Sequence, residues 1–183
     1  MLTSGDKWGI LAAANLAGGV PPAASSPVRT FEGGAAELAF RGSFEFTLDA
    51  KNRLTIPVKF RGPFVDGVTL ARMRDVTDCV SVWCTPVFDA YVESLIASCH
   101  PLSEEREALA RFYGANSQDA ELDAAGRVIV PPRMLATAGI EKDVVVNGVA
   151  NRLEVWARDT WNKVNAELTE AVKEIRPALG TIA

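Results

Sequence analysis

Apolar and polar side chains alternate along residues 44–48 and 53–56, which predicts two short β-strands that each bury one face. The residues between them read Asp-Ala-Lys-Asn, and Asn52 tolerates a positive φ better than most residues. The Asp49 carboxylate can accept hydrogen bonds from backbone amides two residues further on and so close the turn. We therefore expect a stiff strand–turn–strand segment that presents Arg53 away from the buried face.

The same pattern occurs a second time, 74 residues later in the chain. Residues 48–57 read LDAKNRLTIP, and residues 122–131 read LDAAGRVIVP. The equivalent turn positions are Asp49 and Asp123, Asn52 and Gly126, and Arg53 and Arg127. The tips of the turns differ, because Ala125 stands where the first copy has Lys51. A repeat with so long a period indicates a duplicated half-domain rather than a solenoid.

The same order of further elements follows both turns. A proline opens a short helix, two strands come next, and a helix with one apolar face ends each copy. In the first copy, the strands are predicted at residues 67–73 and 79–83, followed by a helix that Thr85 caps. Ser103 caps a connecting helix, which is expected to end at Gly114. In the second copy, the predicted strands are residues 119–122, 127–130, 143–146 and 153–156, and a final helix runs to Pro177.

This order divides the chain into five segments. Residues 1–39 are rich in Ala, Gly, Pro and Ser without sustained periodicity, which predicts a flexible N-terminal extension. The other segments are a first repeat at residues 40–100, a connecting helix at 101–114, a second repeat at 115–176 and a C-terminal tail at 177–183. Because the two hairpins are expected to interlock, we predict one duplicated α+β domain rather than two independent domains.

Charge is distributed unevenly over an acidic chain. The 183 residues are 48% hydrophobic and 23% charged, with a formal net charge of −4, which argues against an indiscriminate coat for nucleic acid. Residues 41–74 nevertheless carry seven basic and three acidic side chains, whereas residues 119–152 carry four basic and five acidic ones. The first copy is therefore the half in which a basic patch is expected.

The cysteine and apolar content points away from several other classes of protein. Cys79, Cys84 and Cys99 have no metal-binding spacing, and their odd number leaves one unpaired in any disulfide scheme. A reducing cytoplasm is therefore expected, without a metal or a cofactor. The chain has no run of about 18 apolar residues, so no membrane span is expected. Residues 9–20 are mildly apolar, but Asn15 and two glycines interrupt them, so we do not predict a signal peptide.

Three motifs together resemble the MraZ family, which belongs to the AbrB/SpoVT swapped-hairpin superfamily. They are the opening Arg41-Gly42, the two Asp-x-x-x-Arg turns, and a Val-Trp strand followed by a helix in each copy. The resemblance covers roughly residues 40–176. The chain departs from the family in its long N-terminal extension and in Asn52, where glycine is usual.

The resemblance implies both a fold and a function. The expected fold is α+β, with a duplicated swapped-hairpin β-barrel-like core of the AbrB/MraZ type and peripheral helices. The family consists of bacterial transcriptional regulators of the division and cell-wall gene cluster, which bind short direct repeats in a promoter as ring-shaped oligomers. Double-stranded DNA and further copies of the chain are therefore the expected partners. The expected location is cytoplasmic and nucleoid-associated.

The residues of interest fall into three groups. Basic residues of the turns and of the opening motif are the candidate DNA contacts: Arg53, Lys51, Arg127 and Arg41. The residues expected to brace the turns are Asp49, Asn52, Asp123 and Gly126. Four further basic residues either join the DNA-binding surface or only form part of the hydrated surface of the barrel: Lys59, Arg61, Arg72 and Arg74. The alternative to a DNA contact is that each turn arginine only forms an exposed ion pair with the aspartate of its own turn, which contributes little to stability.

Two other functions remain as alternatives. A ring-forming protein–protein scaffold without operator recognition would use the acidic second copy as its interaction face. A thiol hydrolase would need Cys84 paired with His100, but no paired acid–base motif surrounds them, so an enzyme is not expected. Trp83, Trp156 and Trp161 are expected to anchor the core or an interface. The alanine at the second tip leaves open whether both turns contact DNA equally.

Overall fold

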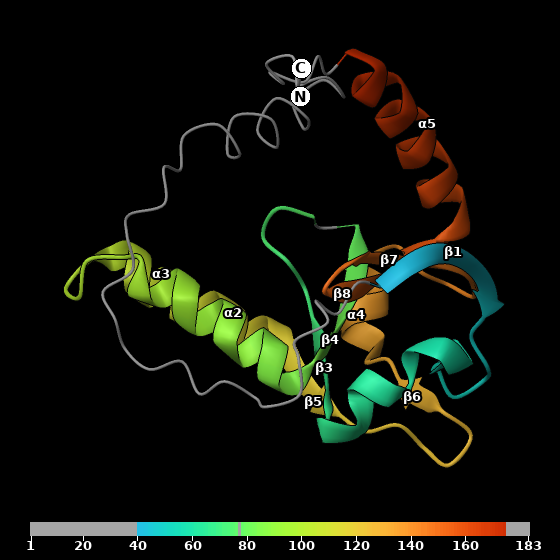
Figure 1. The fold of residues 1–183 in the computed structure, drawn as a ribbon, viewed down its shortest axis with the longest axis horizontal. Helices are drawn as coiled ribbons and strands as arrows, with labels where there is room; N and C mark the ends of the chain where they lie inside the picture. The colour runs from blue at the N-terminus through green and yellow to red at the C-terminus, as the bar shows by residue number, and fades with distance from the viewer. Residues whose placement is uncertain (1–39, 77, 175–183) are drawn as a thin grey trace, which may run out of the picture. The chain divides into compact units, whose positions relative to one another are not determined.

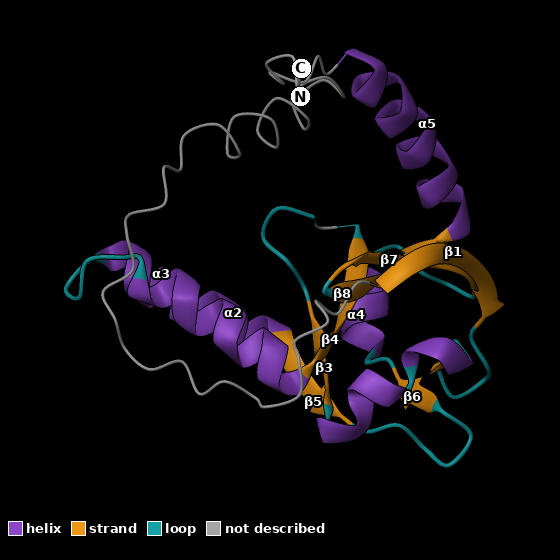
Figure 2. Cartoon of the chain, viewed as in Figure 1, coloured by secondary structure: helices purple, strands orange, loops and turns teal. Residues whose placement is uncertain are grey.

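The computed structural model of the chain describes residues 40–76 and 78–174. The extension predicted at residues 1–39, the tail predicted at 177–183 and the end of the last helix lie outside the described residues. The described chain combines helices with antiparallel strands (Figures 1 and 2), so the α+β class is confirmed. No helix in the described ranges is long and apolar enough to cross a bilayer.

The two copies contain matching elements in the same order. The first copy comprises β1 (Phe40–Thr47), β2 (Arg53–Thr55), the 3-10 helices η1 (Val58–Phe60) and η2 (Gly62–Asp66), β3 (Val68–Ala71), β4 (Cys79–Cys84) and α2 (Thr85–Ala97). The second copy follows α3 (Glu104–Asn116) and comprises β5 (Ser117–Ala120), β6 (Arg127–Ile129), α4 (Pro132–Thr137), β7 (Asp143–Ala150), β8 (Arg152–Ala157) and α5 (Arg158–Glu174).

The strands of the two copies are interleaved. Six strands form one sheet in the order β1-β7-β8-β4-β3-β5, and β2 pairs with β6 in a separate two-stranded ribbon. The counterparts in the two copies are β1 and β5, β2 and β6, β3 and β7, and β4 and β8. Exchanging each strand for its counterpart gives the same two orders, read from the other end. The ladders β1–β7, β4–β8, β3–β5 and β2–β6 all join one copy to the other, and only β3–β4 and β7–β8 lie within a copy.

The expectation of two local hairpins needs a correction. β1 does not pair with β2 across the first turn, because all eight residues of β1 pair with β7, from Phe40 opposite Ala150 to Thr47 opposite Asp143. The alternation of apolar residues sets which face of a strand is buried, but it does not identify the neighbouring strand. Each turn therefore connects a strand of the large sheet to a strand of the ribbon.

The connecting helix α3 also continues beyond its predicted end. It is capped by Ser103, as expected, but it passes Gly114 and runs to Asn116. The Asn116 side chain donates to the Phe112 carbonyl at 2.8 Å, and the Ser117 hydroxyl donates to the Tyr113 carbonyl at 2.7 Å. Because these side chains satisfy carbonyls of the last turn, the helix needs no left-handed glycine to end it. β5 consequently starts at residue 117 rather than 119.

The start of α2 is shifted by one residue from its prediction. Cys84 occupies the N-cap position, and Thr85 is the first helical residue without capping the helix through its side chain. The Thr85 hydroxyl instead accepts a hydrogen bond from the Thr69 hydroxyl at 3.0 Å. This bond links the beginning of α2 to β3.

Buried side chains from both copies form one core beneath the ribbon. Leu54 and Ile56 of the first copy and Val128 and Val130 of the second are completely buried and belong to the same cluster. A smaller cluster around Trp83 packs α2 and α3 against β3 and β4, and Figure 1 shows these two helices alongside each other. The burial of core residues from both copies together supports the treatment of the two copies as one folding unit.

Gly148 of β7 packs closely against the backbone of β1, where it lies opposite Gly42. A Cβ atom at residue 148 would overlap the backbone of Phe40 and Arg41, and backbone atoms cannot rotate away. We therefore expect Gly148→Ala to lower the free energy of unfolding by about 1–3 kcal/mol in urea titrations. Gly114→Ala is the control, because a Cβ there meets no atom within 4 Å, and its stability should stay the same or rise slightly.

Candidate nucleic-acid interface

The first turn is closed by Asp49. Its Oδ1 atom accepts hydrogen bonds from the backbone amides of Lys51 at 2.8 Å and Arg53 at 3.0 Å, and its Oδ2 atom accepts from Arg53 Nε at 2.6 Å. Asn52 adopts a left-handed conformation with φ of 56°, as predicted from its residue type. Asp49 therefore holds the Nε edge of the Arg53 guanidinium as well as the backbone of the turn.

The second turn has the same geometry. The Oδ1 atom of Asp123 accepts from the amides of Ala125 and Arg127, both at 2.9 Å, and its Oδ2 atom accepts from Arg127 Nε at 2.8 Å. Gly126 has a φ of 74°, so the predicted left-handed residue is present here too. The change from Lys51 to Ala125 at the tip leaves the backbone of the turn unaltered.

The ribbon joins both turns into one surface. Leu54 lies opposite Val128 at its centre, with both side chains fully buried. The amide of Ile56 donates to the Gly126 carbonyl, and the amide of Val130 donates to the Asn52 carbonyl, each at 2.9 Å. The two turns therefore lie at opposite ends of the same ribbon, each held by a strand of the other copy.

The outer surface of the ribbon carries both turn arginines. We call it the ribbon face and define it by the residues that alternate with the buried ones: Arg53, Thr55, Arg127 and Ile129. Arg53 lies opposite Ile129 and Thr55 opposite Arg127, so the two arginines are diagonal neighbours, a spacing of roughly 7–8 Å between residues. The ribbon face thus carries one arginine from each turn.

Hydrogen bonding keeps the turn carboxylates charged. Partial burial alone would raise the pKa of Asp49, but bonds from the Arg53 amide and guanidinium and from the Lys51 amide outweigh it and lower the pKa to about 2. The bond from the Arg127 side chain lowers the pKa of Asp123, and the same bond raises the pKa of Arg127. Both ion pairs are therefore fully formed at neutral pH. They orient the arginines while leaving 28% of the Arg53 side chain and 32% of the Arg127 side chain exposed.

The remaining candidate contacts lie in different places. Lys51 is exposed at the tip of the first turn, next to the ribbon face. Arg41 is exposed near the start of β1, six residues before the strand ends and roughly 20 Å from that end along the strand. No hydrogen bond or ion pair within the described ranges connects the Arg41 side chain to either turn. The structure therefore places Arg53 and Arg127 on the ribbon face and Lys51 at the tip of the first turn, whereas Arg41 lies apart on β1.

Two of the other basic residues have structural partners. Lys59 donates from Nζ to the Arg41 carbonyl at 2.9 Å and lies 4.6 Å from the ring centres of Phe44 and Phe60. Its counterpart in the second copy, Arg133, donates to the Ala115 carbonyl at 3.0 Å. Arg74 forms an ion pair with Asp75. Lys59 thus has a role in the fold that does not require DNA, whereas the exposed ion pair of Arg74 contributes little to stability.

Sequence reasoning assigned no specific role to Arg61, which the structure places at the second turn. Its Nε atom donates to the Ile56 carbonyl at 2.9 Å, and its guanidinium packs directly on Gly126. The sequence held no sign of this contact, because residues 61 and 126 are far apart and the repeat has no arginine at the equivalent position.

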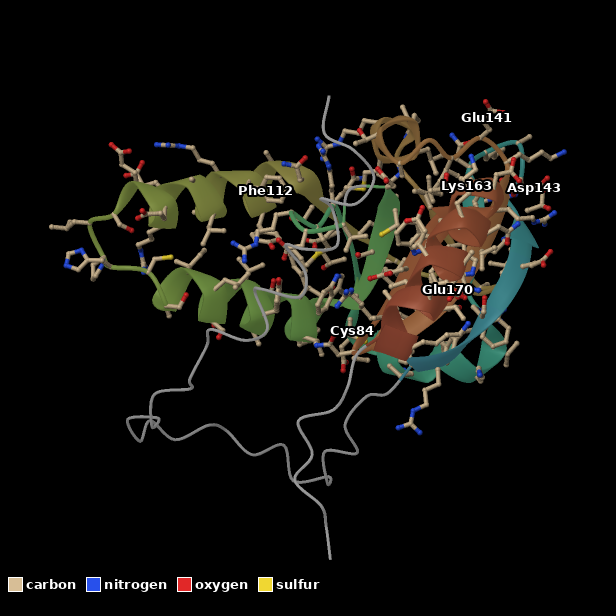
Figure 3. The ribbon with its side chains drawn as sticks, turned by 90° about the horizontal axis from the view of Figure 1, so that it is seen from above. Cys84, Phe112, Glu141, Asp143, Lys163 and Glu170 are labelled. Atoms are coloured by element: carbon tan, nitrogen blue, oxygen red, sulfur yellow. The ribbon has the colours of Figure 1, made fainter. Side chains whose placement is uncertain are left out.

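The structure contradicts the idea of a paired cysteine and histidine. Cys84 is buried where β4 meets α2 (Figure 3), and this burial raises the pKa of its thiol to about 11. His100 follows the opposite end of α2, and a helix of 13 residues is roughly 20 Å long. A protonated thiol so far from the imidazole cannot act as an activated nucleophile.

Comparisons with known proteins connect this geometry to a family. The family model for MraZ proteins, described as antitoxin-like, matches residues 39–111 and again residues 112–177. The chain is 33% identical to a protein from Symbiobacterium thermophilum named transcriptional regulator MraZ, over 76% of this chain and 99% of that protein. Proteins of the same name from Thermoanaerobacter pseudethanolicus and Pseudomonas fluorescens are 31% and 32% identical. Those matches cover 73% and 74% of this chain and 92% and 91% of the relatives.

Proposed function

The chain belongs to the MraZ family, and on that premise we propose that it is a transcriptional regulator which binds double-stranded DNA through the ribbon face. MraZ is a family of transcriptional regulators and not of enzymes. Arg53 and Arg127 are the proposed principal contacts, and Lys51 is a further contact to phosphate. Arg41 is proposed as an outlying phosphate contact on β1.

The observation that supports this proposal best is the pair of aspartate-held arginines on one exposed surface. Each aspartate engages one side of its arginine fork, so the other N–H groups are available for a phosphate oxygen or a guanine edge. Because the turn already restricts the side chain, less conformational entropy is lost when DNA binds. Asp49 and Asp123 brace the arginines rather than contact DNA, since a carboxylate repels phosphate.

The finer features of the proposal come from the family resemblance. We propose that the interleaved strands form a swapped-hairpin, barrel-like core and that several chains assemble into a ring. The ring would bind short direct repeats in a promoter of the division and cell-wall gene cluster, which would make the protein nucleoid-associated in the cytoplasm. A single ribbon face on a chain of net charge −4 offers few phosphate contacts. Several faces in one assembly raise the affinity through effective concentration.

The test is a binding measurement with the DNA upstream of the protein's own gene. Fluorescence anisotropy should show tighter binding to this duplex than to a shuffled duplex of the same composition, and light scattering should show several protomers per particle. Equal affinity for both duplexes, or no binding, would contradict the proposed function. An oligomer without operator binding would favour the scaffold alternative.

Lys51→Ala should weaken binding to all DNA sequences by the same factor. An exposed lysine at a turn tip neutralises a phosphate without reading bases, so the slope of log affinity against log salt should flatten by about 0.9 for each phosphate that the variant leaves unneutralised. Lys163→Ala on α5 (Figure 3) removes the same charge from an exposed position and should leave the slope unchanged. An altered preference between operator and shuffled DNA would show that Lys51 contacts a base instead.

A further inference from the structure

The two turns do not carry the same charge. Residues 49–53 have a net charge of +1, because Lys51 and Arg53 outweigh Asp49, whereas residues 123–127 are neutral. Both turns nevertheless have the same aspartate–arginine bonds and the same left-handed residue. Two turns of one geometry at the ends of one ribbon would meet similar phosphate backbones, so the second turn lacks one cation.

Arg61 of the first copy lies where that cation is missing. Its Nε atom donates to the Ile56 carbonyl at 2.9 Å, and the Ile56 amide donates to the Gly126 carbonyl at 2.9 Å. This chain of two bonds holds the guanidinium over the second turn. A Cβ atom at residue 126 would overlap the guanidinium in this position, so the absence of a side chain lets Arg61 pack directly on the turn, and glycine also suits the positive φ.

Within residues 40–76 and 78–174, the first turn lacks a counterpart of Arg61. The position that matches Arg61 in the second copy is Leu135, which is buried in the core with 5% of its surface exposed. The first turn therefore has a lysine at its tip, and residue 135 of the other copy supplies no cation to it. The second turn has alanine at its tip and Arg61 packed on it. Including Arg61, both turns have a net charge of +1.

We propose that Arg61 is the phosphate-binding cation of the second turn and takes there the role that Lys51 has at the first. This inference rests on the proposed DNA-binding function. The hydrogen bond from Arg61 to the Ile56 carbonyl uses only Nε, so the terminal amino groups of the guanidinium can reach phosphate oxygens. Asp66 and Glu121 line the same hollow as Arg61, but neither forms an ion pair with it among the described residues.

The test compares Arg61→Gln with Arg61→Lys in the full chain. Both variants lose the guanidinium and keep a side-chain donor for the Ile56 carbonyl, so they differ mainly in charge. Anisotropy titrations with the upstream duplex over a range of salt should give a slope flatter by about 0.9 per engaged protomer for Arg61→Gln, and an unchanged slope for Arg61→Lys. Adding Ala125→Lys to Arg61→Gln should restore the slope, because it puts the cation at the tip of the turn.

The possible results separate this inference from the proposed function. If the wild type does not bind DNA, the function itself is refuted, and this inference with it. If the wild type binds and Arg61→Gln has the same slope with only a lower melting temperature, Arg61 merely braces the turn. A measurement on the wild type covers the case of a variant that does not fold: DNA should protect Arg61 from phenylglyoxal as it protects Arg53. Protection of Arg53 alone would overturn the inference.

Discussion

Replacing Arg53 with alanine is expected to abolish operator binding at ordinary salt while the chain still folds and assembles. The substitution removes a guanidinium from the ribbon face but keeps the backbone bond from residue 53 to Asp49 and the left-handed turn at Asn52. The removal of an arginine that binds DNA costs about 1–3 kcal/mol per protomer. When several ribbon faces bind together, these costs combine, so anisotropy should detect no specific complex. Thermal melting and light scattering should be nearly unchanged.

Arg111→Ala provides the matched control for this experiment. Arg111 lies on α3 with 78% of its side chain exposed, and its removal changes the net charge by the same amount. Its operator affinity should equal that of the wild type, which would tie the defect of Arg53→Ala to the position rather than to the charge. A folded, oligomeric Arg53→Ala protein with normal operator affinity would refute the ribbon face as the DNA-binding surface.

The second large effect is expected when the two copies are separated. A protease site inserted near Leu102, which is 91% exposed between α2 and α3, allows the folded chain to be cut there. The cut protein should keep its circular dichroism spectrum, because four of the six ladders join the copies. Each fragment isolated in denaturant should remain unfolded on dilution, since its own strands form at most a two-stranded pair in the large sheet.

Mixing the two fragments should then restore the spectrum and a cooperative melting transition. The loss of structure in each isolated fragment distinguishes an interleaved core from two half-domains that fold separately and only pack together. Cooperative unfolding of either fragment alone would show that one copy buries enough of a core by itself, and the prediction of a single duplicated domain would be wrong.

Features set by neighbouring residues could be predicted from the sequence. The left-handed residues at Asn52 and Gly126 and the cap at Ser103 depend on residue type within a few positions, and all three are present. The burial of Leu54 and the opposite orientation of Arg53 follow from the alternation along a strand. Local sequence was therefore sufficient to predict the geometry of the two turns.

Features that depend on distant residues could not be predicted in the same way. Nothing in the alternation of β1 indicates that its partner is β7 rather than β2. The position of Arg61 on Gly126 requires the ladder between β2 and β6, so the local sequence of neither residue contains it. The end of α3 was misplaced because Gly114 suggested a stop, whereas hydrogen bonds from Asn116 and Ser117 allow the helix to continue.

The symmetric order of the strands makes the chain equivalent to two subunits fused into one polypeptide. In a homodimer with two identical chains, every substitution would occur at both symmetry-related positions. Fusion removes this restriction, since each half is encoded separately and can diverge from the other. A symmetric dimer of identical chains could not have the differences found here, which are lysine at residue 51 with alanine at 125 and arginine at 61 with leucine at 135. One half can therefore accumulate substitutions in its turn while the turn of the other half stays unchanged.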